Sequence, residues 1–149
     1  MPRAIFFGVL AFLSCSTGTD HSFKDQGKIC LFPEGTAPGN AFAPPMSVSF
    51  PPDRGLVITV QAPSCLSGSC DKDRQAACTA TVNGQVIIVT SSASWHREGM
   101  TCTLDCGALV ARCTTAPLPA GTYVIQHGGE TLPVTIPSSG TPPCAGQTL

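Results

Sequence analysis

Hydrophobic and polar residues alternate with a period of two along much of the chain. The segment 56–62 is the clearest case, because Leu56, Ile58 and Val60 fall on one face and the intervening positions fall on the other. Successive side chains of a β-strand point to opposite faces of its sheet, so this pattern predicts a half-buried strand. Pro63 ends the strand, since proline cannot donate a hydrogen bond to a neighbouring strand.

A β-hairpin is predicted for residues 78–90, where two runs rich in β-branched residues flank Asn83-Gly84. Asn-Gly is typical of the type I′ turn, in which both central residues need positive φ. One face of the hairpin carries Cys78, Ala80, Val82, Gln85, Ile87 and Val89, and we assign this face to the hydrophobic core. A two-residue loop places Val82 opposite Gln85, Ala80 opposite Ile87 and Cys78 opposite Val89.

A second hairpin is predicted for residues 120–136, around Gly128-Gly129. Pro133 places its last strand at a sheet edge or at a bulge. Shorter strands are expected at 29–32 and 108–113. About seven short strands separated by turn residues, with no amphipathic helix, predict a β-sandwich.

The segment Leu118-Pro-Ala-Gly-Thr-Tyr-Val-Ile125 resembles the Leu-x-x-Gly-x-Tyr-x-Val strand of immunoglobulin-like and fibronectin-type sandwiches. The resemblance implies an all-β fold class, here a disulfide-rich immunoglobulin-like β-sandwich. True immunoglobulin domains differ, because no cysteine follows Tyr123 by two residues and Trp95 has no cysteine at the matching spacing. The resemblance therefore implies a topology and no binding residues.

The N-terminus predicts export. Arg3 precedes an uncharged apolar run over residues 4–13, which is typical of a signal peptide and shorter than the about 20 residues that a membrane span needs. The run ends Phe12-Leu-Ser-Cys15, which resembles the lipobox of bacterial lipoprotein precursors. The resemblance implies that residues 1–14 are a signal peptide and that Cys15 is acylated, so the protein should incorporate palmitate.

Acylation of Cys15 would anchor the protein to a membrane, because two or more acyl chains hold a protein there stably. Ser16 in the next position implies an outer-membrane lipoprotein, on the periplasmic or the surface face. Ordinary signal cleavage after Ser16 or Gly18 is the alternative, and it would release a secreted protein. Residues 15–28 are polar without periodicity, so we expect a tether there, followed by one domain over 29–149 with a loose C-terminal tail.

Cysteine usage also indicates an oxidising compartment. The chain has nine cysteines, and without Cys15 eight remain, an even number that predicts four disulfides. We predict one pairing, Cys30 with Cys144, because these outermost cysteines adjoin Gly- and Pro-rich segments; the other pairings stay open. A zinc site on Cys65-x4-Cys70 and Cys102-x3-Cys106 is the alternative. The predicted disulfide cysteines are Cys30, Cys65, Cys70, Cys78, Cys102, Cys106, Cys113 and Cys144.

Composition and motifs give few indications of chemistry. Eight Lys and Arg against nine Asp and Glu give a net charge of −1, so no nucleic-acid-binding surface is predicted. Motifs of serine hydrolases, zinc proteases and nucleotide-binding loops are absent, and we expect no catalytic residue, cofactor, metal or small-molecule substrate. Asp71-Lys-Asp73 begins like a calcium loop, but Ala76 and Val82 stand where Gly and Glu are required, which favours a solvated turn.

The candidate ligand contact is Trp95-His96-Arg97, which we expect in a loop, because Trp and Arg are over-represented at binding hot spots. A buried Trp95 with solvated neighbours is the alternative. His21 and His127 are expected to be surface residues.

Two functional classes follow. The first is a non-enzymatic, lipid-anchored envelope protein whose loops bind another envelope protein or a glycan. The second is a secreted protease inhibitor that presents the Cys65-Leu-Ser-Gly-Ser-Cys70 loop, clamped at both ends. An enzyme is the third class, and no motif favours it.

Overall fold

A computed structural model describes residues 18–36, 47–99 and 101–146, and the signal peptide and Cys15 lie outside these residues. The fold is all-β, and the described residues form eleven strands and no helix, where about seven strands were expected. Short edge strands account for most of the difference. The strands are β1 Thr19–Lys24, β2 Lys28–Pro33, β3 Val48–Phe50, β4 Leu56–Gln61, β5 Asp71–Asn83, β6 Val86–Arg97, β7 Val110–Thr114, β8 Gly121–His127, β9 Glu130–Ile136, β10 Ser138–Gly140 and β11 Cys144–Ala145.

The largest sheet is built around the long strand β6. One edge of β6 pairs with β5 along nearly its whole length. Its other edge is shared: Val86–Val89 pairs in parallel with β8, and residues 92–97 pair antiparallel with β1. Strand β9 extends the sheet beyond β8, while a second sheet has the order β11-β2-β4-β7 and a third contains only β10 and β3.

The main core lies between the β6-β8-β9 part of the first sheet and the second sheet. Leu56, Ile58 and Val60 of β4 are buried in it, as predicted, but Val57 and Thr59 on the other face are buried as well, so the expectation of a half-buried strand is wrong. Ile87 of β6 and Ile125 of β8 contact it from the first sheet and are at most 1% exposed. Burial of each such side chain stabilises the fold by about 1.5–3 kcal/mol. We call these packed sheets, together with the core between them, the body.

Both hairpins form, but the first has a different turn. Gly84 has φ +60° while Asn83 does not have positive φ, so the loop is Gly84-Gln85 and the type I′ assignment is wrong. A glycine at the first central position is typical of type II′. Val82 therefore faces Ile87 instead of Gln85. This moves each pairing by two residues, so the predicted core face is kept.

The second hairpin matches its prediction. His127 pairs with Glu130 across Gly128-Gly129, and Gly128 has φ +56°. Pro133 lies on β9, which is an edge strand of the first sheet. Proline is tolerated there because an edge strand has one side without a neighbour to which an N–H must donate.

Residues 19–24, which were expected in the tether, form strand β1 instead. The strand has few apolar residues, which is why its pattern was missed. His21 and Phe23 nevertheless lie two positions apart on one face, where both rings stack on Trp95 at centroid distances of 5.2 Å. Trp95 forms a second, small core with Ala62 and Leu66.

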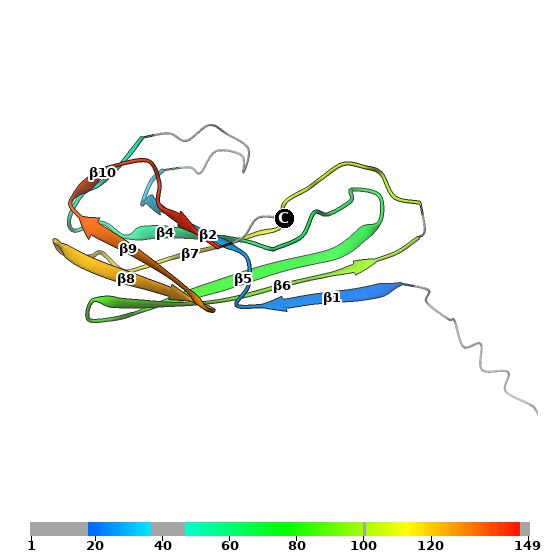
Figure 1. The fold of residues 1–149 in the computed structure, drawn as a ribbon, viewed down its shortest axis with the longest axis horizontal. Helices are drawn as coiled ribbons and strands as arrows, with labels where there is room; N and C mark the ends of the chain where they lie inside the picture. The colour runs from blue at the N-terminus through cyan, green and yellow to red at the C-terminus, as the bar shows by residue number, and fades with distance from the viewer. Residues whose placement is uncertain (1–17, 37–46, 100, 147–149) are drawn as a thin grey trace, which may run out of the picture.

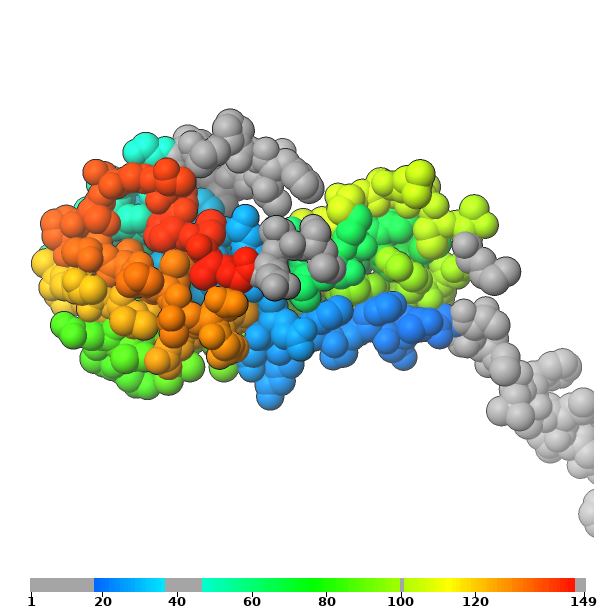
Figure 2. Space-filling view, in the orientation of Figure 1, coloured from blue at the N-terminus to red at the C-terminus, as the bar shows by residue number. Residues whose placement is uncertain are grey.

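The second core belongs to a region that extends from the body in one direction (Figure 1). It consists of β1, the adjoining ends of β5 and β6, and two loops, 62–70 and 98–109, of which residue 100 is not described. We call it the stapled end. In the space-filling view it is the narrower part of an elongated molecule (Figure 2).

Four disulfides connect the described cysteines, as predicted, and Cys30 is joined to Cys144. These two residues lie directly opposite each other on β2 and β11. A second bridge, Cys78 to Cys113, joins β5 of the first sheet to β7 of the second. Four disulfides indicate that the protein folds in an oxidising, extracytoplasmic environment.

Candidate functional site

The two loops of the stapled end are joined covalently. Disulfides link Cys65 to Cys106 and Cys70 to Cys102. Between them, Leu66 and Gly107 exchange backbone hydrogen bonds of 3.0 and 2.8 Å. Since these cysteines are all paired, the alternative of a zinc site on their thiolates is wrong.

A buried carboxylate organises the base of loop 62–70. Asp71 is 2% exposed, and its two oxygens accept hydrogen bonds from Nε and Nη2 of Arg97 at 2.7 and 2.8 Å. The Ser67 N–H donates to the same carboxylate at 2.6 Å. The Arg97 guanidinium is the main cause that lowers the pKa of Asp71 below 3.8, and the Ser67 N–H also lowers it. Asp71 is therefore an ion-pair residue, not part of a solvated turn or a calcium loop.

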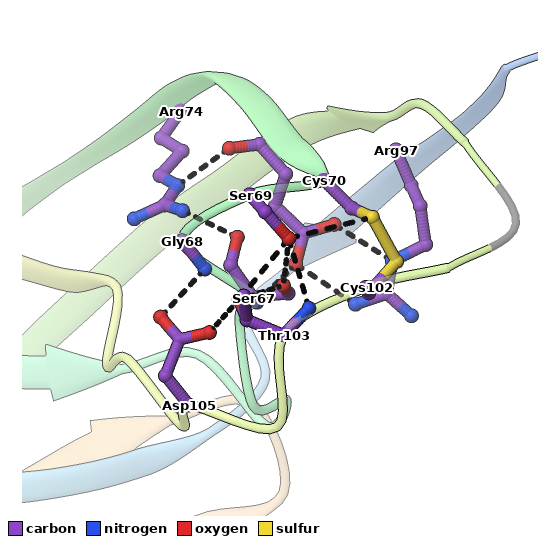
Figure 3. Close-up of a disulfide and its surroundings, with 10 residues drawn as sticks. Ser67, Gly68, Ser69, Cys70, Arg74, Arg97, Cys102, Thr103 and Asp105 are labelled. Carbon is purple, nitrogen blue, oxygen red and sulfur yellow. Dashed lines mark hydrogen bonds and ion pairs between the residues drawn. A yellow bond between two sulfur atoms is a disulfide. The ribbon is translucent and has the colours of Figure 1, made fainter.

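Arg74 holds the same segment from the other side. Its guanidinium donates to the backbone oxygens of Asp71 and Ser67 at 2.9 and 2.7 Å. Figure 3 shows these contacts beside the Cys70–Cys102 disulfide. The base of the loop is thus fixed by two arginines that lie on neighbouring strands.

The segment Cys102-Thr-Leu-Asp-Cys106 lies against loop 62–70 (Figure 3). The backbone N–H of Thr103 donates to Ser69 Oγ at 2.9 Å, and Asp105 Oδ2 accepts a bond of 2.8 Å from the Gly68 N–H. The Thr103 hydroxyl also donates to the Asp105 carboxylate. These donors lower the pKa of Asp105, with the hydroxyl as the largest cause.

Leu104 is the exposed residue of this segment. Residues 102–106 contain no turn or bend and no positive φ, and the two cysteines of the segment are bonded to loop 62–70. Thr103 and Asp105 face loop 62–70, and Leu104 points into solvent with a relative exposure of 103%. The other exposed large hydrophobic residues of the described chain, Ile88 and Val110, are 40% and 42% exposed.

Leu104 is held in place from both sides. Cys102 and Cys106 lie two residues before and after it, and they are bonded to Cys70 and Cys65 of loop 62–70. Within the described part of the chain, the Leu104 N–H and C=O have no hydrogen-bond partner. Fixing the backbone of a free peptide costs about 1–2 kcal/mol of conformational entropy per residue. This segment is already ordered in the folded protein, so binding would not incur that cost again. The segment can therefore bind a partner in an extended form with little further ordering.

The predicted contact residues lie nearby, but not in a loop. Trp95, His96 and Arg97 end strand β6. Trp95 is 2% exposed, so the alternative prediction of a buried Trp95 is confirmed. The Arg97 guanidinium is paired with the Asp71 carboxylate. His96 Nδ1 lies 2.6 Å from Asp20 Oδ1, and this contact is the main cause that raises the pKa of His96 above 6.5. These side chains therefore serve mainly to stabilise the stapled end and are not placed as a ligand-contact surface.

The loop 65–70 is clamped at both cysteines, as the inhibitor hypothesis expected. Its only large side chain, however, is inside: Leu66 is 1% exposed. Gly68 and Ser69 are exposed but offer little surface. Sequence reasoning missed Leu104, although its pattern, an apolar residue centred between two polar ones and two cysteines, was present in the chain.

One contact between a potential nucleophile and a histidine occurs in the described residues, at the junction of β6, β8 and β1. Ser91 Oγ lies 2.8 Å from His127 Nε2, and both residues are buried. The Asp25 carboxylate accepts from the Ser91 N–H at 2.8 Å instead of orienting the imidazole. Burial lowers the pKa of His127 below 6.5. His127 was expected at the surface and is instead part of the body.

The described ranges also bear on membrane and metal binding. No helix there could cross a membrane, and no group of three His, Cys, Asp or Glu side chains is arranged to hold a metal ion. Comparison with known protein families, curated proteins and solved structures finds no match for this chain.

Proposed function

We propose that the protein is an exported, non-catalytic binding protein whose recognition surface is the stapled end. The observation that carries this proposal is Leu104, a fully exposed apolar side chain fixed between two disulfides. Loops on a rigid scaffold are where such modules place recognition. A protein partner is favoured over a glycan, because a leucine side chain offers apolar contact and no hydrogen bond.

We further propose that the body is a variant of the immunoglobulin-like sandwich. Tyr123 donates a hydrogen bond of 2.9 Å to the backbone oxygen of Pro119, four residues earlier. A tyrosine bonded to the backbone just upstream of its strand is a recurring feature of these sandwiches. The Cys78–Cys113 bridge between the two sheets also supports the proposal.

The non-catalytic part of the proposal rests on the Ser91–His127 contact. A nucleophile and its base need a third group that orients the base and an opening through which substrate enters. Here the serine is 8% exposed and the nearby carboxylate binds a backbone amide. The contact therefore fits a buried hydrogen bond of the body better than a catalytic pair.

Attachment to a membrane through acylated Cys15, with delivery to the outer membrane, remains part of the proposal. The apolar run and the lipobox resemblance support it. Palmitate labelling should tag the wild-type protein, and Cys15→Ala should remove the tag. An unlabelled wild-type product in the culture medium would instead support the secreted form.

Site-specific photo-crosslinking tests the recognition surface. A photoreactive residue at Thr101, which is exposed on loop 98–109 of the stapled end, should capture a partner in cells that produce the protein. The same residue at Thr131, which is exposed on β9 of the body, is the matched control and should capture none. Crosslinks at Thr131 and not at Thr101 would place recognition on the body and overturn the proposal.

A further inference from the structure

We infer that the segment Cys102–Cys106 is a substrate-like inhibitory loop for serine proteases whose specificity pocket is apolar, with Leu104 as the side chain that enters this pocket. This inference rests on the proposed function, because it names the partner of the same surface. It assigns the role to a different loop from the one that the sequence favoured.

The first argument is conformational. Serine proteases act on a peptide whose scissile carbonyl is presented to the catalytic serine, and the side chain preceding the scissile bond fills the specificity pocket. Residues 102–106 run without turn or bend, and the Leu104 side chain points away from the protein. The Leu104 N–H and C=O have no partner among the described residues, so they are free to pair with the backbone of a partner.

The second argument is that the loop is supported on both sides of the Leu104–Asp105 peptide bond. On one side Cys102 is bonded to Cys70, and the Thr103 N–H donates to Ser69 Oγ. On the other side Cys106 is bonded to Cys65, and the Asp105 carboxylate accepts from the Gly68 N–H. A cut between Leu104 and Asp105 would leave both new ends attached to the same short loop.

This support distinguishes an inhibitor from a substrate. Attack by the protease serine on the Leu104 carbonyl carbon would break the Leu104–Asp105 bond, transfer the serine proton through the protease histidine to the Asp105 amine, and leave Leu104 as an acyl ester on the serine. A flexible substrate then loses its amine fragment. Here the amine stays beside the ester, so it attacks the ester carbon, returns its proton through the histidine and restores the peptide bond.

The third argument is specificity. Leu104 suits an apolar pocket of the chymotrypsin type and not a pocket with a carboxylate at its base, as in trypsin. The one charged residue next to it does not interfere, since the Asp105 carboxylate is held by Gly68 and Thr103. The inference therefore predicts which protease is inhibited and which is not.

The test is an inhibition assay with the purified, oxidised mature protein against chymotrypsin and trypsin, using small chromogenic substrates. Wild type should inhibit chymotrypsin and leave trypsin active. Leu104→Arg should weaken the inhibition of chymotrypsin by at least about 30-fold, the size of a hot-spot loss, and should gain inhibition of trypsin. Ile88→Arg, which changes an exposed hydrophobic residue of the body, is the matched control and should change neither inhibition.

A second variant tests the support. A Cβ on Gly68 would lie 2.5 Å from Asp105 Oδ2, so Gly68→Ala should displace the carboxylate while Leu104 remains. Inhibition should weaken, and cleavage between Leu104 and Asp105, followed by mass spectrometry, should become faster than in wild type. Circular dichroism and a count of four disulfides by mass spectrometry confirm that each variant is folded.

Two results would overturn the inference. One is a correctly folded wild type that inhibits neither protease; the other is rapid cleavage after Leu104 without inhibition. Either result leaves the proposed function standing if a partner that is not a protease is captured at Thr101, and both proposals fail if Thr101 captures nothing.

Discussion

The body and the stapled end are held together in different ways. Among the residues that the structure describes, sixteen buried hydrophobic residues form the core of the body, while three form the core of the stapled end. The stapled end instead contains two of the four disulfides, the Asp71–Arg97 ion pair and the hydrogen bonds between its loops. A region with so small a core cannot fix its loops by burial alone, so covalent and polar contacts replace it. The exposed position of Leu104 depends on these contacts.

The largest effect should come from the core of the body. Ile87 on β6 is fully buried, so Ile87→Ala should lower the free energy of unfolding by about 2–5 kcal/mol. Ile88, the next residue, is 40% exposed, and Ile88→Ala should cost much less. Urea denaturation of both variants measures the difference. Equal losses would mean that burial does not decide the stability of this strand.

Two disulfides of similar span compare the regions directly. Cys70–Cys102 in the stapled end and Cys78–Cys113 in the body have sequence separations of 32 and 35 residues. Removing either pair by double substitution to alanine should cost about 2–4 kcal/mol, since the entropy of the closed loop is similar.

The two variants should differ in where the protein opens. Without Cys70–Cys102, amide hydrogen exchange should accelerate in loops 62–70 and 98–109 and stay slow in β2 and β4. Without Cys78–Cys113, it should accelerate in β5 and β7 of the body. Faster exchange in β4 after loss of the Cys70–Cys102 bridge would show that the regions unfold as one unit.

The smallest effect should be that of pH, and its sign differs between regions. Burial lowers the pKa of His127, against the opposing carboxylates of Asp25 and Glu130. The unfolded chain therefore binds a proton near pH 6.5 that the folded protein resists, so stability should fall as the pH drops from 6.5 toward the folded pKa. The raised pKa of His96 acts oppositely, since its contribution is lost as the pH rises through that pKa.

Melting temperatures measured between about pH 7.5 and 5 test this assignment. His127→Gln should flatten the decline on acidification, and His96→Gln should make the decline steeper. The contribution of Asp71 to stability changes at lower pH. It is present above pH 3.8 and is lost as the pH falls through the lowered pKa of Asp71. An unchanged slope in His127→Gln would assign the decline to other groups.

The comparison also explains which features could be predicted from sequence. The strands of the body carry apolar alternation and the hairpins carry glycine turns, so local patterns were sufficient. Strand β1 and the last half of β6 are mostly polar, and they are strands because each pairs with the other at long range. The parallel pairing of β6 with β8 likewise has no local signal.

The candidate site was predicted only in part. The even set of cysteines indicated disulfides, but their pairing depends on which loops meet in the fold. Trp95 attracted attention as an aromatic residue, and burial beneath β1 removed it from the surface. The exposure of Leu104 could not be read from composition, because it results from hydrogen bonds and disulfides that hold the residues on both sides of it against loop 62–70.

The pairing of β1 with the end of β6 has a consequence for orientation. Thr19 lies opposite Arg97 at the stapled end, and Cys15 precedes Thr19 by four residues, a chain length of at most about 15 Å. A lipid on Cys15 would therefore hold this end close to the bilayer, with the body pointing outward. Cleavage after Gly18 would leave the same end free in solution. The peptidase that processes the N-terminus would thus determine which molecules the Leu104 loop can reach.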